Sequence, residues 1–345
     1  MRFGSVSAKV ELMQYWGDGW RLKLNFAWFL LWCWWRVFKT NPNVVYVSDP
    51  IATAAGVLLL LTMKIPVIYH EHDSPFEVPR SGSEKVITII RNLLAKKSLL
   101  CIIPSLTRAE EFSSAVRTKA PIIRVMNCPS LRENRETVSS GLKSDELKLY
   151  YHGSIVPERV PLKLLDALSL VSDKVTLTIA GYETIGNPGY VSRFRREARQ
   201  RGLASRVRFE GPFPLRDALL KFCAEHHVGL ALLPRQSKDP NVRAMAGASN
   251  KVFDYLACGL PVLVSDTPDN QKLFVDAGLA RSCDPDDAKS IASQFLWFLE
   301  NPLRSGEMSK RGIRKILVDW NYEKQFQPVL DTVLHDLSRK VQGNV

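Results

Sequence analysis

Short apolar runs rich in valine and isoleucine alternate with helical patterns along nearly the whole chain of 345 residues. This alternation is typical of βαβ units, in which helices cover both faces of a parallel sheet. The chain is therefore predicted to be an α/β protein. In its first half the predicted strands are Val6–Met13, Val44–Val47, Val67–Tyr69, Leu99–Ile103 and Ile122–Met126.

The same pattern repeats after a polar stretch, Asn127–Asp145, which is predicted to be a linker. Two doubly wound domains are expected, at residues 1–140 and 141–320, and a helix in residues 321–345 is expected to pack back toward the first domain. Such sheets bind ligands at the carboxyl ends of their strands, and two of them in tandem face a cleft. The strands predicted in the second half are Lys148–His152, Val175–Ala180, Val207–Glu210, Val228–Leu233, Pro261–Val264 and Leu279–Arg281. The helices predicted between them are Pro161–Val171, Gly189–Gly202, Leu215–His226, Asn250–Ala257 and Asp269–Ala277.

The composition is that of a globular protein in a reducing compartment. With 46% hydrophobic and 24% charged residues, a disordered chain and a fibre are both excluded. The six cysteines are widely spaced and form no Cys-x-x-Cys pair, so neither a zinc site nor a disulfide framework is indicated. A cytoplasmic location fits this cysteine usage best.

The formal net charge of +12 favours anionic partners. Nucleic acid is disfavoured, because the basic residues lack interleaved aromatic residues and no recognition fold is suggested. The stretch Arg193–Arg208 holds seven arginines and one glutamate. It is interpreted either as a solvated helix face or as a contact with anionic lipid or acidic glycan.

Six of the eight tryptophans lie within the first 35 residues. The uninterrupted apolar run there, Phe26–Trp35, is ten residues long, whereas a membrane span needs about 20. A signal peptide is a poor fit, since Lys39–Pro42 offers no small-residue cleavage site. The segment is predicted to be a helix, either in the core of the first domain or lying in the plane of a lipid interface beside basic residues, and both can hold if each uses one face of the helix.

The segment Ala248–Val262 is the most informative about chemistry. Ser249 is a good N-cap and Gly259 a good C′ residue, so a helix is predicted between them. Its N-terminus faces the ligand edge of the sheet, where free N–H groups suit a phosphate. Lys251 adds a full charge in the first turn, against the helix dipole, and such a cation calls for an anionic ligand.

Segment Ser249–Asp266 resembles the donor-binding signature of retaining GT-B glycosyltransferases of family GT4. The resemblance extends to Tyr151–Arg159, which is similar to the phosphate-contacting loop of that family, and to the strand ends at Gly181 and Gly211–Phe213. In the first half, the strand ends Val44–Pro50 and Val67–Asp73 are similar to those that face the family's cleft.

The resemblance implies two Rossmann-like domains facing a cleft, with a nucleotide-sugar site in the second. It implies transfer of a sugar from a nucleotide diphosphate sugar to a glycan or lipid-linked acceptor, with the anomeric configuration retained. The family needs no metal and no other cofactor, because helix N-termini and basic residues neutralise the leaving diphosphate. The absence of an Asp-x-Asp motif agrees with this. The expected setting is cell-surface polysaccharide or glycolipid synthesis, on the inner face of the cell membrane.

Individual roles follow from the resemblance. Arg159 and Lys251 would hold the diphosphate, while His72 would face the transferred sugar and Asp73 orient an acceptor hydroxyl. Asp254 would accept hydrogen bonds from the ribose, and Phe213 would lie near the base. The donor-binding set is completed by Gly153, Ser154, Gly181, Ser249 and Asn250. No metal ligands are predicted, because His70 and His72 lack a third ligand.

Two family positions differ. Ala246 stands where the family often has a glutamate, and Ser154 where it often has an arginine. The first strand of the family's N-terminal domain is also expected to be missing, since it should precede Phe3. Two alternatives follow: a catalytically silent GT-B scaffold in a glycan-assembly complex, or a GT-B nucleotide-sugar epimerase, for which no additional acid and base carboxylates were found.

Overall fold

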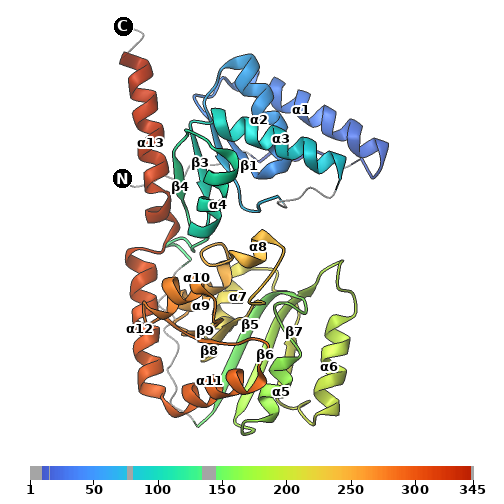
Figure 1. Ribbon diagram of the computed structural model, residues 1–345, viewed down its shortest axis with the longest axis vertical. Helices are drawn as coiled ribbons and strands as arrows, with labels where there is room; N and C mark the ends of the chain where they lie inside the picture. The colour runs from blue at the N-terminus through green and yellow to red at the C-terminus, as the bar shows by residue number, and fades with distance from the viewer. Residues whose placement is uncertain (1–9, 15, 76–80, 134–144, 343–345) are drawn as a thin grey trace. The chain divides into compact units, whose positions relative to one another are not determined.

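The computed structural model describes residues 10–14, 16–75, 81–133 and 145–342. The chain divides into two compact units. The first unit is Met1–Glu71, Pro79–Cys101 and Val116–Pro121, and the second is His72–Val78, Ile102–Ala115 and Ile122–Val345. The α/β prediction is confirmed, because the described residues form two parallel sheets with helices between their strands (Figure 1).

The first sheet has the strand order β1-β2-β3-β4. Its strands follow the predicted apolar runs closely, because each run is short, apolar and bounded by polar residues or proline. They are β1 (Val45–Ser48), β2 (Val67–His70), β3 (Leu100–Ile103) and β4 (Ile122–Arg124). The strand predicted at Val6–Met13 is wrong for residues 10–13, which form no strand, and its residues 6–9 lie outside the described part of the chain.

Three helices of the first unit pack side by side. The helix α2 (Asp49–Met63) contacts both α1 (Trp20–Thr40) and α3 (Gly82–Lys97). The middle helix is strongly apolar and buries Ala55, Gly56 and Leu59 against its neighbours. The tryptophan-rich helix α1 buries none of its residues. The prediction of a helix here is confirmed, but the interpretation as a core helix is wrong.

The second sheet has the order β10-β9-β8-β5-β6-β7. Its strands are β5 (Leu147–Ile155), β6 (Val175–Glu183), β7 (Val207–Glu210), β8 (Val228–Ala231), β9 (Val262–Ser265) and β10 (Ala280–Cys283). Each neighbouring pair runs parallel, and β5 and β6 pair over nine residues. The order reverses beside β5, which makes this sheet doubly wound, as the sequence predicts.

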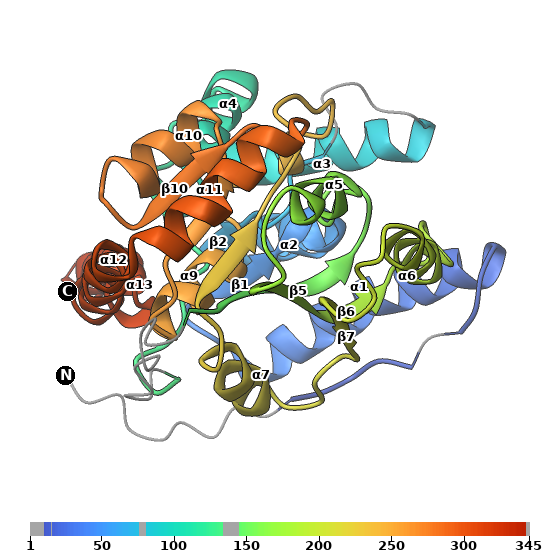
Figure 2. The same ribbon diagram turned by 90° about the horizontal axis from the view of Figure 1, so that it is seen from below.

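Helices cover both faces of this sheet, as Figure 2 shows. Side chains of β5 alternate between the two cores: Leu149 and Tyr151 point into one, and Tyr150 into the other. The first core is closed by α5 (Lys163–Ser169), α6 (Tyr190–Gln200) and α11 (Ala288–Glu300). The second is closed by α7 (Arg216–Cys223), α9 (Asn250–Ala257), α10 (Pro268–Asn270) with the π-helix η1 (Gln271–Val275) that follows it, and α12 (Pro302–Val318). The four arginines on the outer side of α6 are exposed, as expected for a solvated helix face.

Three further helices complete the second unit: α4 (Leu106–Val116), α8 (Pro240–Arg243) and α13 (Tyr322–Gln342). The last confirms the helix predicted in residues 321–345. Its first turn is held by the segment that follows β4, since Tyr322 N donates to Pro129 O at 2.9 Å. The direction in which residues 321–345 pack overall stays a prediction. In the part of the chain that the structure describes, we find no helix with both the length and the apolar content needed to span a bilayer.

Candidate functional site

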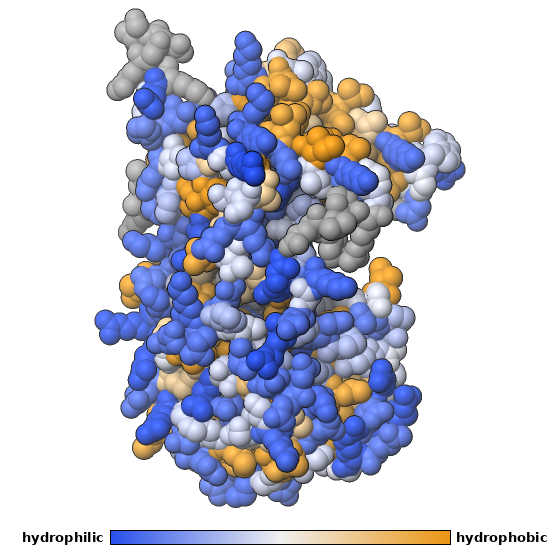
Figure 3. Space-filling view, viewed as in Figure 1, coloured by the Kyte–Doolittle hydropathy of each residue, from blue (hydrophilic) through white to orange (hydrophobic). Residues whose placement is uncertain are grey.

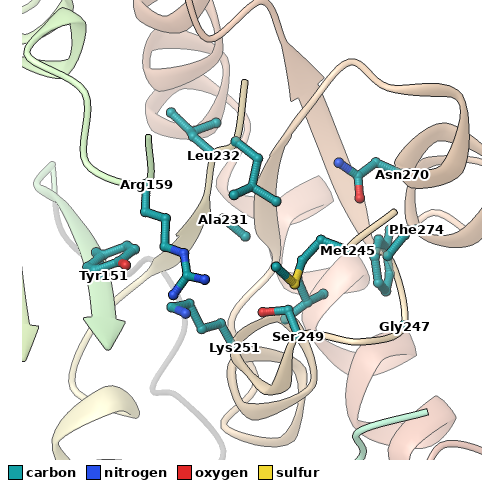
Figure 4. A pocket seen from close by; sticks show the side chains of 13 residues that line it. Tyr151, Arg159, Ala231, Leu232, Met245, Gly247, Ser249, Lys251, Asn270 and Phe274 are labelled. Atoms are coloured by element: carbon teal, nitrogen blue, oxygen red, sulfur yellow. The ribbon is translucent and has the colours of Figure 1, made fainter. Parts of the chain in front are cut away.

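A cavity lies in the second unit, at the carboxyl end of β8, beside the loop that follows β5 and the N-terminus of α9 (Figure 4). This is the edge of a doubly wound sheet at which ligands bind. The lining residues are Tyr151, Arg159, Ala231, Leu232, Leu233, Met245, Ala246, Gly247, Ser249, Lys251, Val252, Asn270 and Phe274. None of them is acidic, and two are cations.

The two cations of the cavity, Arg159 and Lys251, point toward one another in Figure 4. Arg159 donates a hydrogen bond from Nη1 to Ser154 Oγ. The Lys251 Nζ lies 5.7 Å from the centre of the Tyr151 ring. Burial and then the nearby charge of Arg159 lower the pKa of Lys251 to about 8. Two like charges sharing a half-enclosed site stabilise an anion placed between them.

The helix α9 presents Lys251 in its first turn, and its bounds agree with the prediction. Ser249 has the extended backbone of an N-cap, with φ −95° and ψ 124°, but its side chain makes no capping hydrogen bond. The hydroxyl and the first N–H groups of the helix therefore stay available to a ligand in the cavity. Asn250 is exposed and is not among the lining residues.

Glycines let the strand ends and Lys251 come together. A Cβ on Gly153, whose φ is +118°, would stand 2.8 Å from the Lys251 Cε. A Cβ on Gly181, whose φ is +149°, would stand 1.8 Å from the Gly153 carbonyl oxygen. Both predicted glycines are thus needed because they lack a Cβ. At Gly153 the space is occupied by the Lys251 side chain, and at Gly181 by the Gly153 backbone.

Asp254 lies deeper, with 1% of its surface exposed, and does not line the cavity. The His152 Nε2 lies 3.2 Å from its Oδ2, and Arg216 donates to its Oδ1 at 2.6 Å. Arg216 also donates to Glu133 Oε1 at 2.7 Å. Burial would raise the pKa of Asp254, but the hydrogen bonds and charges of His152 and Arg216 outweigh it and hold that pKa below its usual value.

The remaining predicted residues lie outside the cavity lining. Phe213 packs on Phe222, with ring centres 5.1 Å apart. Arg108 donates to the His72 backbone oxygen at 2.5 Å and lies 3.6 Å from Asp73, whose side chain is exposed. The roles assigned to these residues stay predictions.

His70 and Glu71 have structural partners. Tyr46 hydrogen-bonds His70, and Glu71 receives two hydrogen bonds of 2.6 Å from Arg91. Within the described ranges, no group of three or more His, Cys, Asp and Glu side chains is placed to hold a metal ion.

The sequence did not single out the apolar wall of the cavity. Leu232 and Leu233 follow β8 and were expected to belong to that strand. Met245, Asn270 and Phe274 come from loops and short helices whose positions depend on tertiary packing. No local sequence signal marks these three residues. For Tyr151 there was such a signal, because it stands two residues before the predicted Gly153.

Two parallel sheets of Rossmann-like topology, the second with a cationic cavity at its ligand edge, define the class of GT-B glycosyltransferases. Residues 133–315, just over half of the chain, match the family model described as glycosyl transferases group 1. The chain belongs to this family and is a glycosyltransferase.

Solved structures share this fold. The sucrose-phosphate synthase of Thermosynechococcus elongatus is 16% identical with a TM-score of 0.67, over 94% of this chain and 80% of that chain. Alr3699/HepE from Anabaena, solved with UDP, is 16% identical with a TM-score of 0.70, over 90% of this chain and 82% of that chain. At these identities the likeness shows the fold alone. No functionally curated protein matches the sequence.

Proposed function

We propose that the protein is a retaining glycosyltransferase of family GT4 that moves a sugar from a nucleotide diphosphate sugar to a glycan or lipid-linked acceptor. The observation that carries the proposal is the pair Arg159 and Lys251 in a cavity without an acidic lining residue. A diphosphate leaving group gains negative charge in the transition state. Two fixed cations and the N-terminus of α9 are placed to stabilise that charge.

The same arrangement supports a reaction without a metal ion or other cofactor. A divalent cation would supply charge neutralisation that the two side chains already provide. UDP is the first nucleotide to test, because the neighbouring structures of Alr3699/HepE were solved with UDP and with UDP-glucose. Nucleic acid is not proposed as a partner. The setting that we propose is cell-surface polysaccharide or glycolipid synthesis by a cytoplasmic protein held peripherally at the inner face of the membrane.

The proposed ribose contact of Asp254 requires a rearrangement. Its two oxygens already accept from His152 and twice from Arg216, which uses three of about four lone-pair sites. The side chain of Arg216 is 36% exposed and has room to swing toward solvent. We propose that the ribose hydroxyls replace Arg216 as donors to Asp254 when the nucleotide binds. His72 and Asp73 are proposed to serve the transferred sugar and the acceptor.

The test is a transfer assay with UDP-sugars and lipid-linked or glycan acceptors, with and without EDTA. We expect unchanged turnover in EDTA and a product with the donor's anomeric configuration, read from proton NMR couplings. An inverted product or activity restored only by a divalent metal would contradict the proposal. Nucleotide binding without turnover on any acceptor would favour the catalytically silent scaffold, for which Ala246 in the cavity wall is the supporting observation.

The lowered pKa of Lys251 predicts how nucleotide binding depends on pH. Below pH 8 the free protein carries the charged amine, and above it the neutral one predominates. A bound diphosphate favours the charged form, so binding takes up a proton at alkaline pH and UDP affinity falls by about tenfold per pH unit above about pH 8. Calorimetric titrations between about pH 7 and pH 10 measure this slope. Lys251→Arg should remove it, because arginine stays charged, and an equal slope in both proteins would refute the assignment.

A further inference from the structure

The helix α1 carries a continuous stripe of exposed apolar side chains. The stripe consists of Trp20, Leu24, Trp28, Leu31, Trp35 and Phe38, each between 49% and 67% exposed. Their spacing of three and four residues places them on one face of the helix, over a length of about 27 Å. Figure 3 shows apolar side chains gathered over the region that Figure 1 labels α1, α2 and α3.

The neighbouring helices of the first unit carry further exposed apolar side chains. On its other side α1 packs on α2, where Trp34 Nε1 donates to Thr62 Oγ1 at 3.0 Å. The helix α2 adds Ile51 and Leu61, which are 68% and 59% exposed. The helix α3 adds a second stripe of the same spacing, Val86, Ile89 and Leu93. Extended exposed apolar surface of this kind marks an interaction site.

Basic side chains flank the α1 stripe. On a helical projection, Arg21 and Lys39 lie along one edge of the stripe and Lys23 along the other, and all three are exposed. Arg21 lies 5.7 Å from the Trp20 ring centre, and Lys39 lies 5.3 Å from that of Trp35. The helix contains no acidic residue. The surface therefore combines an apolar centre, interfacial aromatics and a positive rim.

We infer that this face, defined by the α1 stripe and its flanking Arg21, Lys23 and Lys39, docks in the plane of a lipid bilayer that carries anionic headgroups. Tryptophan is favoured at the boundary between acyl chains and headgroups, and the cations are complementary to anionic lipid. A second copy of the chain is a poorer occupant. A two-fold interface would bring the same cations of both copies together, with no acidic residue on either helix to pair them.

The inference deepens the proposed function, because a lipid-linked acceptor would lie in a membrane surface. It rests on the proposed function only for the identity of that acceptor. Vesicle binding needs neither donor nor acceptor, and UDP binding needs no vesicle. The two measurements therefore fail independently.

The experiment is vesicle flotation of the full chain, with phosphatidylcholine alone or mixed with phosphatidylglycerol. We expect flotation with the mixed vesicles at low salt and its loss at about 1 M salt, where the Debye length is about 3 Å. Tryptophan fluorescence should be quenched by lipids brominated on the acyl chain, because six of the eight tryptophans lie in or near α1. Unquenched fluorescence, or equal recovery with neutral and mixed vesicles, would overturn the inference.

Two double variants separate the apolar and charged contributions. Trp28→Ser with Trp35→Ser should weaken vesicle binding about tenfold or more, since such binding scales with the apolar area buried. Arg21→Gln with Lys39→Gln should weaken it by about 30-fold, since each basic side chain near an anionic surface contributes roughly fivefold. The matched controls lie in the second unit and should bind as the parent does: Leu215→Ser with Leu303→Ser, and Lys310→Gln with Arg314→Gln.

All the substituted side chains are exposed, so thermal unfolding and UDP binding should remain unchanged. Parent-like vesicle binding by the tryptophan variant would overturn the inference. A second result would also overturn it: the parent sediments as a dimer and binds no vesicles, and the same tryptophan substitutions dissociate the dimer. The α1 face would then be an interface between two copies of the chain.

Discussion

Replacing Arg159 or Lys251 by alanine is expected to weaken UDP binding about 100-fold each, equivalent to about 3 kcal/mol for a lost charged hydrogen bond. Both side chains line the same cavity, and their cationic ends point toward each other. When one of these side chains is removed, only one positively charged side chain remains in the cavity, together with the N-terminus of α9, to neutralise the diphosphate. Calorimetry at neutral pH measures the loss directly.

Lys251→Met separates charge from packing. Methionine keeps an unbranched apolar chain in the space beside Tyr151 and above Gly153 but carries no charge. Because the folded protein lowers the pKa of Lys251, the charged amine destabilises the fold at neutral pH, and this penalty fades as the pH rises from about 8 toward the usual value. Lys251→Met should therefore lose UDP affinity while the unfolding temperature stays equal or rises.

The exposed residues Arg199 and Lys310 provide charge-matched controls. Alanine at either position should leave UDP affinity within about twofold of the parent, because distant exposed charges are screened by salt. Equal losses at these positions and in the cavity would mean that UDP responds only to net charge. The donor site would then lie elsewhere.

The elements that the sequence predicted best are those with an unambiguous local pattern. The strand β7 at Val207–Glu210 and the helix α9 at Asn250–Ala257 have the predicted bounds. Each is a short segment whose ends carry polar or capping residues. The position of Lys251 in the first turn of α9 followed from the same capping pattern. The phosphate site inferred from that position stays a prediction.

The features that the sequence did not predict depend on contacts between distant segments. The partners of Asp254 come from β5 and from the start of α7, and no local pattern joins those elements to α9. The strands β5 and β6 continue to Ile155 and Glu183, beyond the predicted ends at His152 and Ala180. Glycine normally interrupts a strand pattern, but here Gly153 pairs with Gly181 across the two strands.

For α1 the sequence left two interpretations open, because an apolar aromatic run suits a core and a lipid interface equally well. The difference lies in which neighbours cover the helix. Only one side of α1 meets α2, and its outward stripe has no cover among the described residues of the first unit. Periodicity specifies a face, whereas tertiary structure decides whether that face is buried.

The pairing of the two glycines makes Gly181→Ala the substitution with the largest expected effect on stability. Its Cβ would stand 1.8 Å from the Gly153 carbonyl oxygen, and the φ of +149° is one that alanine rarely adopts. The obstacle is backbone on a neighbouring strand, so no side-chain rotation relieves it. We expect a loss of about 4 kcal/mol and a fall of about 10 °C in the unfolding temperature measured by calorimetry.

Two other glycines test the reason for this loss. Gly211→Ala meets no atom within 4 Å and has no left-handed φ, so its stability should change by less than about 1 kcal/mol. Gly153→Ala meets the flexible end of Lys251, which can move aside, so it should cost about 1–2 kcal/mol for its φ of +118°. Because the moved lysine no longer faces the diphosphate, Gly153→Ala should also weaken UDP binding. If the unfolding temperature of Gly181→Ala lies within a few degrees of that of the Gly211→Ala control, the ends of β5 and β6 do not approach as closely as the structure shows. The space that we assign to Lys251 beside Gly153 would then also be wrong.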